Sequence, residues 1–259
     1  MKYFNEEDCS GQMTQKCKMD LMALMNSRID QIIETVGSGM KSLISDEDTM
    51  KSVSLSCPQS RIMKKEVFLF EVLHSRCVQK SLSILKNFQL IFILYIYRIP
   101  TKSNLSYLKC VVLVRPTSEN IRLLSKEITS PRYGSYYIFF TNKVKRADLK
   151  TLAENDSSEV VKDIREVPSD FLVFEPHVYT VKVSIPIKNL RWNKSTMALG
   201  RCADSLKALL LALKGSRANI CYVKDSSVCE ELAHGIKDEI VHDGPRDTLL
   251  VLMDRRTDP

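Results

Sequence analysis

The sequence predicts an α/β protein with open sheets arranged in two lobes. Apolar residues make up 44% of the 259 residues, which is enough for a substantial core. The run Leu108–Val114 is apolar apart from Lys109, as is typical of a parallel strand covered by helices on both faces. Strand-like and helix-like segments alternate on either side of this run, and that alternation is the pattern of an open α/β sheet.

The first lobe is predicted to begin after residues 1–18, a polar and aperiodic stretch that we expect to be a disordered tail. From Met19 apolar residues recur at helical spacing until Gly37-Ser38-Gly39, where glycine can end a helix. Short strands, separated by the polar turn Asp46-Glu47-Asp48 and by a short helix at 58–63, are predicted at Leu43–Ile44, Val53–Leu55 and Val67–Phe70.

The rest of the chain alternates regularly between helix-like and strand-like patterns. Helices are predicted at 117–128, 147–153, 196–214 and 228–240. Strands are predicted at 108–114, 136–140, 160–167, 171–174, 179–183, 220–223 and 249–253. We place the boundary between the two lobes near Pro168, where the alternation restarts.

Charge and cysteine content restrict the class of protein. The net charge of +7 is spread along the chain without Lys/Arg blocks, which argues against nucleic-acid binding. The eight cysteines include no C-x-x-C pair, and the N-terminus carries acidic residues where a secretory signal needs an apolar core. The apolar run Phe88–Tyr97 is too short to span a bilayer. We therefore expect a cytoplasmic protein with free thiols.

The best candidate for a chemical site is the motif Asp254-Arg255-x-x-Asp258 at the end of the last predicted strand. Open α/β sheets bind ligands at the carboxyl ends of their strands, so Asp254 and Asp258 could serve a small hydrolase-like enzyme. The alternative is a structural ion pair that holds the strand end, and the absence of an accompanying acid–base partner favours it.

Other motifs do not indicate catalysis. Gly37-Ser38-Gly39 follows a helix and precedes a strand, the wrong order for a dinucleotide-binding loop. No G-x-S-x-G elbow surrounds any serine, and no histidine has metal-like spacing from a cysteine. The sequence therefore predicts no metal, no cofactor and no catalytic residues, and it favours a binding protein.

Several ordered blocks carry a family resemblance. They are GMKSLISDEDT, KKEVFLFE, LKCVVLVRPTSENI, SPRYGSYYIFFTN, ADLKTLAEND and LLVLMDRRTDP. Across residues 27–71 and 98–259 the chain resembles the endosomal branch of the Sec/Munc (SM) family of SNARE regulators. The resemblance implies a first α/β domain at 19–168 and the first half of a second, split α/β domain at 169–259. The family's helical third domain would then be absent, and Asp254, Arg255 and Asp258 would be structural residues of an incomplete Rossmann-like fold.

Residues 72–97 depart from the family pattern. Without them Glu71 would join Arg98, as the resemblance requires, and the extra 26 residues contain no Asp or Glu. We interpret them as an insert from a retained intron or a gene-model error. A transcript that reads Glu71 directly into Arg98 would support this interpretation, and a transcript that contains the insert throughout would contradict it.

The resemblance also implies a function and two binding surfaces. SM proteins bind syntaxin-type SNAREs and support vesicle docking and fusion, without enzymatic activity. A pocket for the N-terminal peptide of syntaxin maps to Leu149, Val161, Ile164 and Glu166. Contacts to folded syntaxin in a central cavity map to Asp46, Lys51 and Glu71. The implied partners are a syntaxin-type SNARE and SNARE complexes, with peripheral attachment to Golgi and endosomal membranes through SNAREs only.

Overall fold

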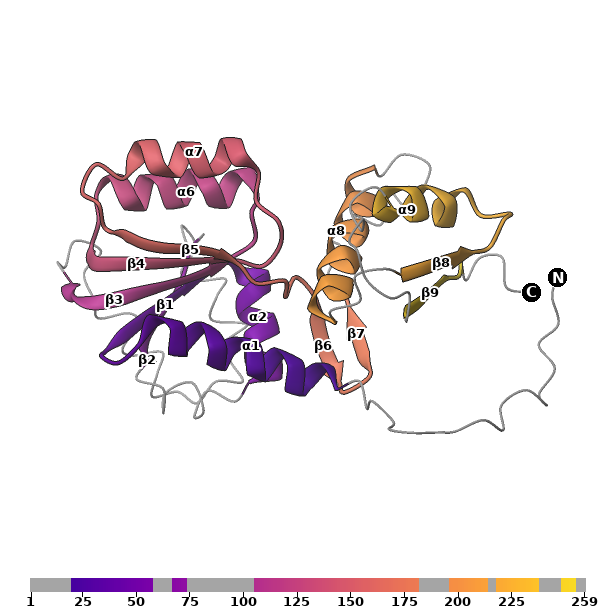
Figure 1. Cartoon of the computed structure of the whole chain (residues 1–259), viewed down its shortest axis with the longest axis horizontal. Helices are drawn as coiled ribbons and strands as arrows, with labels where there is room; N and C mark the ends of the chain where they lie inside the picture. Colours follow the sequence, from indigo (N-terminus) through magenta and orange to yellow (C-terminus); the bar gives the residue numbers. More distant parts are fainter. Residues whose placement is uncertain are drawn as a thin grey trace, which may run out of the picture.

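A computed structural model describes residues 20–57, 67–73, 105–181, 196–213, 218–237 and 248–254. Figure 1 shows two lobes side by side. The elements of the first lobe are α1 (Leu21–Val36), β1 (Lys41–Ser45), α2 (Glu47–Ser56), β2 (Val67–Val72), β3 (Leu105–Val114), α6 (Ser118–Thr129), β4 (Tyr133–Phe140), α7 (Arg146–Asn155) and β5 (Val161–Glu166). Those of the second lobe are β6 (Leu172–Glu175), β7 (Val178–Thr180), α8 (Thr196–Ala212), β8 (Ala218–Tyr222), α9 (Ser227–Lys237) and β9 (Thr248–Leu252).

The first lobe is built on a five-stranded parallel sheet in the order β2-β1-β3-β4-β5. Helices α1 and α2 cover one face and α6 and α7 cover the other (Figure 1). Along β3, Val112 packs into the cluster beneath α6 and α7, while Val111 and Leu113 pack into the cluster beneath α1 and α2. Both faces of β3 are thus buried, as its continuous apolar run predicted.

The helix α2 replaces a strand that the sequence predicted at Val53–Leu55. Alternation of apolar residues with serine suggested a period of two, which would place both side chains on one face. Instead, Val53 is 2% exposed and Leu55 is 49% exposed, because they lie on different faces of a helix. The predicted polar turn at 46–48 is the start of this helix, and the predicted helix at 58–63 lies outside the described residues.

The strand β2 extends beyond Phe70, where the prediction ended it. Val72 pairs with Ser45 of β1, and Leu73 donates its backbone N–H to the Ser45 carbonyl and packs against the core. The first two residues of the predicted insert at 72–97 therefore continue the strand region, and the origin of the insert stays a prediction. Its remaining residues lie outside the described part of the chain.

The described strands of the second lobe form two separate two-stranded sheets. Strands β6 and β7 form an antiparallel hairpin, and β8 pairs in parallel with β9. Helices α8 and α9 cover one face of β8–β9, where Leu252 is buried. Leu249 and Val251 on the other face are 62% and 54% exposed. The two-stranded sheet agrees with the predicted incomplete second domain.

Helix α1 contacts both lobes. Asp20 caps its N-terminus by accepting a hydrogen bond from the Ala23 N–H at 2.9 Å, and Gly37, with φ of 75°, ends it. Leu21 and Met25 pack against β6 and α8, whereas the C-terminal half of the helix packs on the first sheet. Among the described helices, none combines the length and the hydropathy that a bilayer span requires.

Candidate functional site

The usual ligand site of this sheet is filled by the protein's own side chains. The strand order reverses between β1 and β3, and ligands of open α/β sheets bind at the carboxyl ends of the strands flanking such a point. Here Asp46 follows β1 and is 3% exposed. Its carboxylate accepts hydrogen bonds from the Arg115 N–H at 2.8 Å, the Arg115 Nε at 3.3 Å and the Asn120 Nδ2 at 3.2 Å.

Asp46 also begins helix α2. The carboxylate accepts hydrogen bonds from the backbone N–H groups of Asp48 and Thr49, both at 3.1 Å, and from the Thr49 hydroxyl at 2.9 Å. A carboxylate has about four lone-pair positions, so these partners saturate it. Asp46 is therefore buried and its carboxylate is fully used within the first lobe, and its predicted contact with syntaxin stays a prediction.

The other two predicted cavity residues lie on two different elements. Lys51 lies on α2 and makes an exposed ion pair with Glu47 at 2.6 Å. Glu71 lies on β2, opposite Ile44 in the register, and its side chain is outside the described part of the structure.

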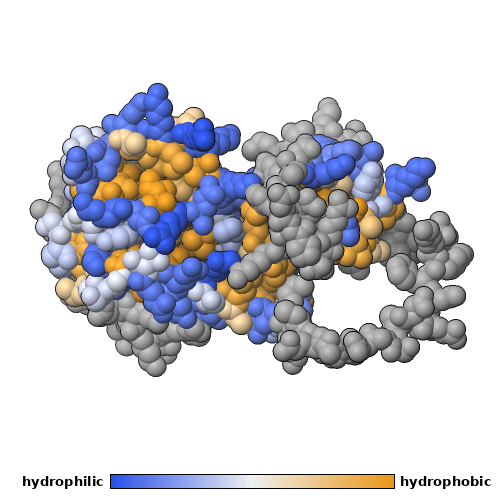
Figure 2. Space-filling model, viewed as in Figure 1, coloured by the Kyte–Doolittle hydropathy of each residue, from blue (hydrophilic) through white to orange (hydrophobic). Residues whose placement is uncertain are grey.

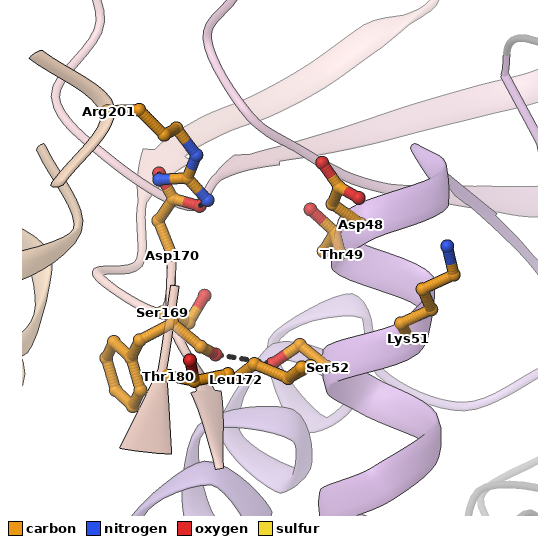
Figure 3. Close-up of a pocket in the computed structure, with 10 residues that line it drawn as sticks. Asp48, Thr49, Lys51, Ser52, Ser169, Asp170, Leu172, Thr180 and Arg201 are labelled. Atoms are coloured by element: carbon orange, nitrogen blue, oxygen red, sulfur yellow. Dashed lines mark hydrogen bonds and ion pairs between the residues drawn. The ribbon is translucent and has the colours of Figure 1, made fainter. Parts of the chain in front are cut away.

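A polar recess separates α2 from the second lobe (Figure 3). The Arg201 guanidinium donates two hydrogen bonds to the Asp170 carboxylate, both at 2.8 Å, and the two side chains face each other in Figure 3. The Ser52 hydroxyl donates to the Phe171 carbonyl at 2.7 Å across the recess. The free space is about 20 Å³, room for about one water molecule, so the recess is a polar joint.

Burial at this joint affects the Asp170 carboxyl group. Removal from water raises the pKa of Asp170 to about 6, although the neighbouring guanidinium of Arg201 lowers it. The Ser205 hydroxyl donates to the Asp170 carbonyl at 2.6 Å, so the same residue is bound to α8 twice. Sequence analysis missed this joint, because 31 residues separate Asp170 from Arg201 and no motif connects them.

An apolar surface lies at the opposite edge of the first sheet, where the sequence predicted a peptide pocket. We define the β5–α7 patch as the half-buried apolar residues that pack against the core beside edge strand β5. They are Val144, Leu149, Val160, Val161 and Ile164. Figure 2 shows an apolar area between the α6–α7 layer and β5, bordered by hydrophilic residues. The structure thus brings the three predicted apolar pocket residues together.

Glu166 fixes one side of this patch. Its Oε1 accepts a hydrogen bond from the Val144 N–H at 2.9 Å, which holds the segment before α7 against the end of β5. The side chain is exposed, and its second oxygen has no partner among the described residues. Val144, which the sequence analysis did not select, completes the patch. It is the one apolar residue within the polar run 141–146, and that signal could have identified it.

The strand-end motif is only partly described. The Asp254 carboxylate accepts a hydrogen bond from the Ser226 hydroxyl at 2.8 Å, and the Cys229 N–H donates to that hydroxyl at 3.3 Å at the start of α9. These hydrogen bonds connect the end of β9 to the start of α9. Arg255 and Asp258 lie outside the described residues. Within the parts that the structure describes, no three His, Cys, Asp or Glu side chains gather where they could hold a metal ion.

The first lobe thus combines a half-buried apolar patch at a sheet edge with a strand-end crevice that internal side chains occupy. The chain belongs to the Sec1 family, whose model matches residues 41–259. It is 31% identical over 251 residues to vacuolar protein sorting-associated protein 45 of Dictyostelium discoideum, covering 93% of this chain and 39% of the relative. The human protein of the same name is 30% identical over 222 residues, covering 86% and 34%.

A solved structure of a protein with the same name is also similar to this chain. The SM protein Vps45 in complex with the Qa SNARE Tlg2 is similar with a TM-score of 0.76 and 29% identity, over 93% of this chain and 40% of that chain. The chain thus spans between about a third and two fifths of the length of these relatives and of this structure.

Proposed function

We propose that this protein binds a syntaxin-type SNARE through the β5–α7 patch and acts in vesicle-mediated protein transport. The observation that carries the proposal is the gathering of Leu149, Val161 and Ile164 at the edge of the first sheet, with Glu166 beside them. Half-buried apolar side chains with a polar rim are what a short peptide with an apolar anchor requires. The similarity to Vps45, which has been solved with a Qa SNARE, supports this class of partner.

The proposal includes the cellular setting and the domain organisation. Docking and fusion of vesicles on the Golgi–endosome route is the process we propose, with peripheral attachment through SNAREs and no enzymatic role. We also propose that residues 19–168 form the first domain and 169–259 part of the second. The five-stranded sheet with its two helical layers supports the first of these units.

The test is a calorimetric titration of the full chain with a peptide from the N-terminus of Tlg2. We expect micromolar binding, and we expect Leu149→Lys to abolish it, because a charge would be placed in the apolar contact. Leu55→Lys is the matched control, since Leu55 is a half-exposed leucine on α2, remote from the patch. Circular dichroism would show that both variants are folded. Equal binding by the wild type and by Leu149→Lys would reject the patch as the site.

A further inference from the structure

The β5–α7 patch is bordered by three cations that make no ion pair with any residue the structure describes. Lys143, Lys145 and Arg146 lie at the start of α7, and all three side chains are exposed. None of the three makes a salt bridge or a side-chain hydrogen bond among the described residues. Three uncompensated positive charges therefore stand within four consecutive residues.

Several other surface cations of the same lobe are paired with carboxylates, although Lys126 is not and Lys162 contacts only a backbone carbonyl among the described residues. Arg122 pairs with Glu119 at 2.6 Å, Lys150 with Glu154 at 3.7 Å and Arg165 with Asp163 at 2.6 Å. These pairs are local on one helix or strand, as is usual for a solvated surface. The cluster at the start of α7 departs from that pattern, although Asp148 lies in the first turn of the same helix.

The position of the cluster connects it to the apolar patch. Val144 lies between Lys143 and Lys145, packs against the core, and donates its N–H to Glu166. Because Val144 is turned inward, the two lysines that flank it stand at the rim of the patch. An apolar centre with a charged rim is the usual anatomy of a protein-binding surface, in which the rim selects among partners.

We propose that Lys143, Lys145 and Arg146 select a peptide that carries acidic residues next to its apolar anchor, a specificity that rests on the proposed function. The apolar part would contact Leu149, Val161 and Ile164, and the acidic part would contact the three cations. A peptide fits better than an anionic membrane surface, because the cations border half-buried apolar side chains that the apolar anchor of a peptide can contact, whereas lipid headgroups would use the charges alone.

The experiment compares two labelled synthetic peptides by fluorescence anisotropy with the full chain. Both peptides have the same apolar residues, and one carries two glutamates where the other carries two glutamines. We expect the acidic peptide to bind about tenfold more tightly at low salt, because each exposed charge contact contributes a few-fold. The difference should shrink at about 0.5 M salt, where screening is strong.

Two triple variants locate the effect. Lys143→Gln/Lys145→Gln/Arg146→Gln should remove the preference for the acidic peptide while leaving the binding of the glutamine peptide within about twofold. Lys126→Gln/Lys224→Gln/Lys237→Gln makes the same change in net charge at three exposed lysines elsewhere, and it should retain most of the preference.

The outcomes separate this inference from the proposed function. Equal affinity of the wild type for both peptides, with binding still abolished by Leu149→Lys, would overturn the acidic preference alone. Binding of neither peptide by a folded chain would overturn both proposals. Co-sedimentation with phosphatidylserine vesicles that the first triple variant loses, together with equal peptide affinities, would assign the cations to a lipid surface and overturn the inference.

Discussion

The two lobes differ in how far they bury an apolar strand. Strand β3 of the first lobe lies between two helical layers, and Val111, Val112 and Leu113 are all buried. Strand β9 of the second lobe has one helical layer, so that Leu250 and Leu252 pack inward while Leu249 and Val251 are exposed. A continuous apolar run therefore predicts a parallel strand in both lobes. It also indicates a strand covered on both faces, and among the described residues only the first lobe covers both.

The lobes also differ in how polar groups are used. The first lobe fills the carboxyl ends of β1 and β3 with the Asp46 network, while the joint to the second lobe depends on the Asp170–Arg201 pair. The first network is internal to one rigid unit, and the second connects two units. Their removal should therefore have different consequences, and three experiments test this comparison.

The largest effect is expected from Asp46→Ala. This change removes a buried carboxylate that six donors share and leaves Arg115 and Asn120 without their common acceptor. Loss of one partner of a buried charged pair costs about 3–5 kcal/mol, so we expect the free energy of unfolding to fall by that amount. Urea denaturation followed by far-UV circular dichroism would measure it.

The control is Glu47→Ala, which removes the exposed partner of Lys51 on the same helix and should cost less than about 1 kcal/mol. A small effect of Asp46→Ala, equal to that of the control, would show that Asp46 is not the centre of the first lobe. It would also favour the surface role that the family resemblance implies.

The sequence predicted most strands and helices of the described chain, since periodicity determines them locally. It failed at α2, where Val53 and Leu55 alternate with serines in a pattern that fits a strand as well as a short helix. The signal that distinguishes the two is the N-cap. The Asp46 carboxylate accepts a hydrogen bond from the Thr49 N–H three residues later, so the predicted polar turn at 46–48 is a helix start.

Sequence reasoning grouped residues that pack together on neighbouring elements, and it missed long-range polar contacts. The binding roles assigned to both groups stay predictions. Leu149, Val161 and Ile164 lie on one edge because α7 and β5 are neighbours in the sequence and in the fold. Asp46 was assigned to a surface, although only the distant positions of Arg115 and Asn120 make it an internal residue. Position along the chain carries no direct signal for such contacts.

A second test uses pH at the joint between the lobes. The pKa of Asp170 is raised to about 6 by burial, from an ordinary value of 3.8, so the folded state binds this proton more tightly than the unfolded state. Its contribution to stability therefore increases as the pH falls from about 7 to about 4. A shift of about two pKa units sets an upper limit of about 3 kcal/mol on this change in the free energy of unfolding.

The measurement compares the wild type with Asp170→Asn across this pH range by thermal unfolding. The free-energy difference between the two proteins should shift in favour of the wild type as the pH falls. Asp204→Asn, which changes an exposed carboxylate on α8, is the control and should show no such trend. A difference that moves in favour of the wild type as the pH rises would mean that the Arg201 pair dominates over burial.

The smallest effect is expected at the bare face of the second lobe, and it tests the comparison most directly. Val251→Thr exchanges similar volumes at a side chain that is 54% exposed, so the free energy of unfolding should change by less than about 0.5 kcal/mol. The matched change Val112→Thr places a hydroxyl in a fully buried position of β3 and should cost about 1–3 kcal/mol. Equal costs would mean that Val251 is covered in solution, and light scattering at rising concentration would then show whether a second copy of the chain covers it.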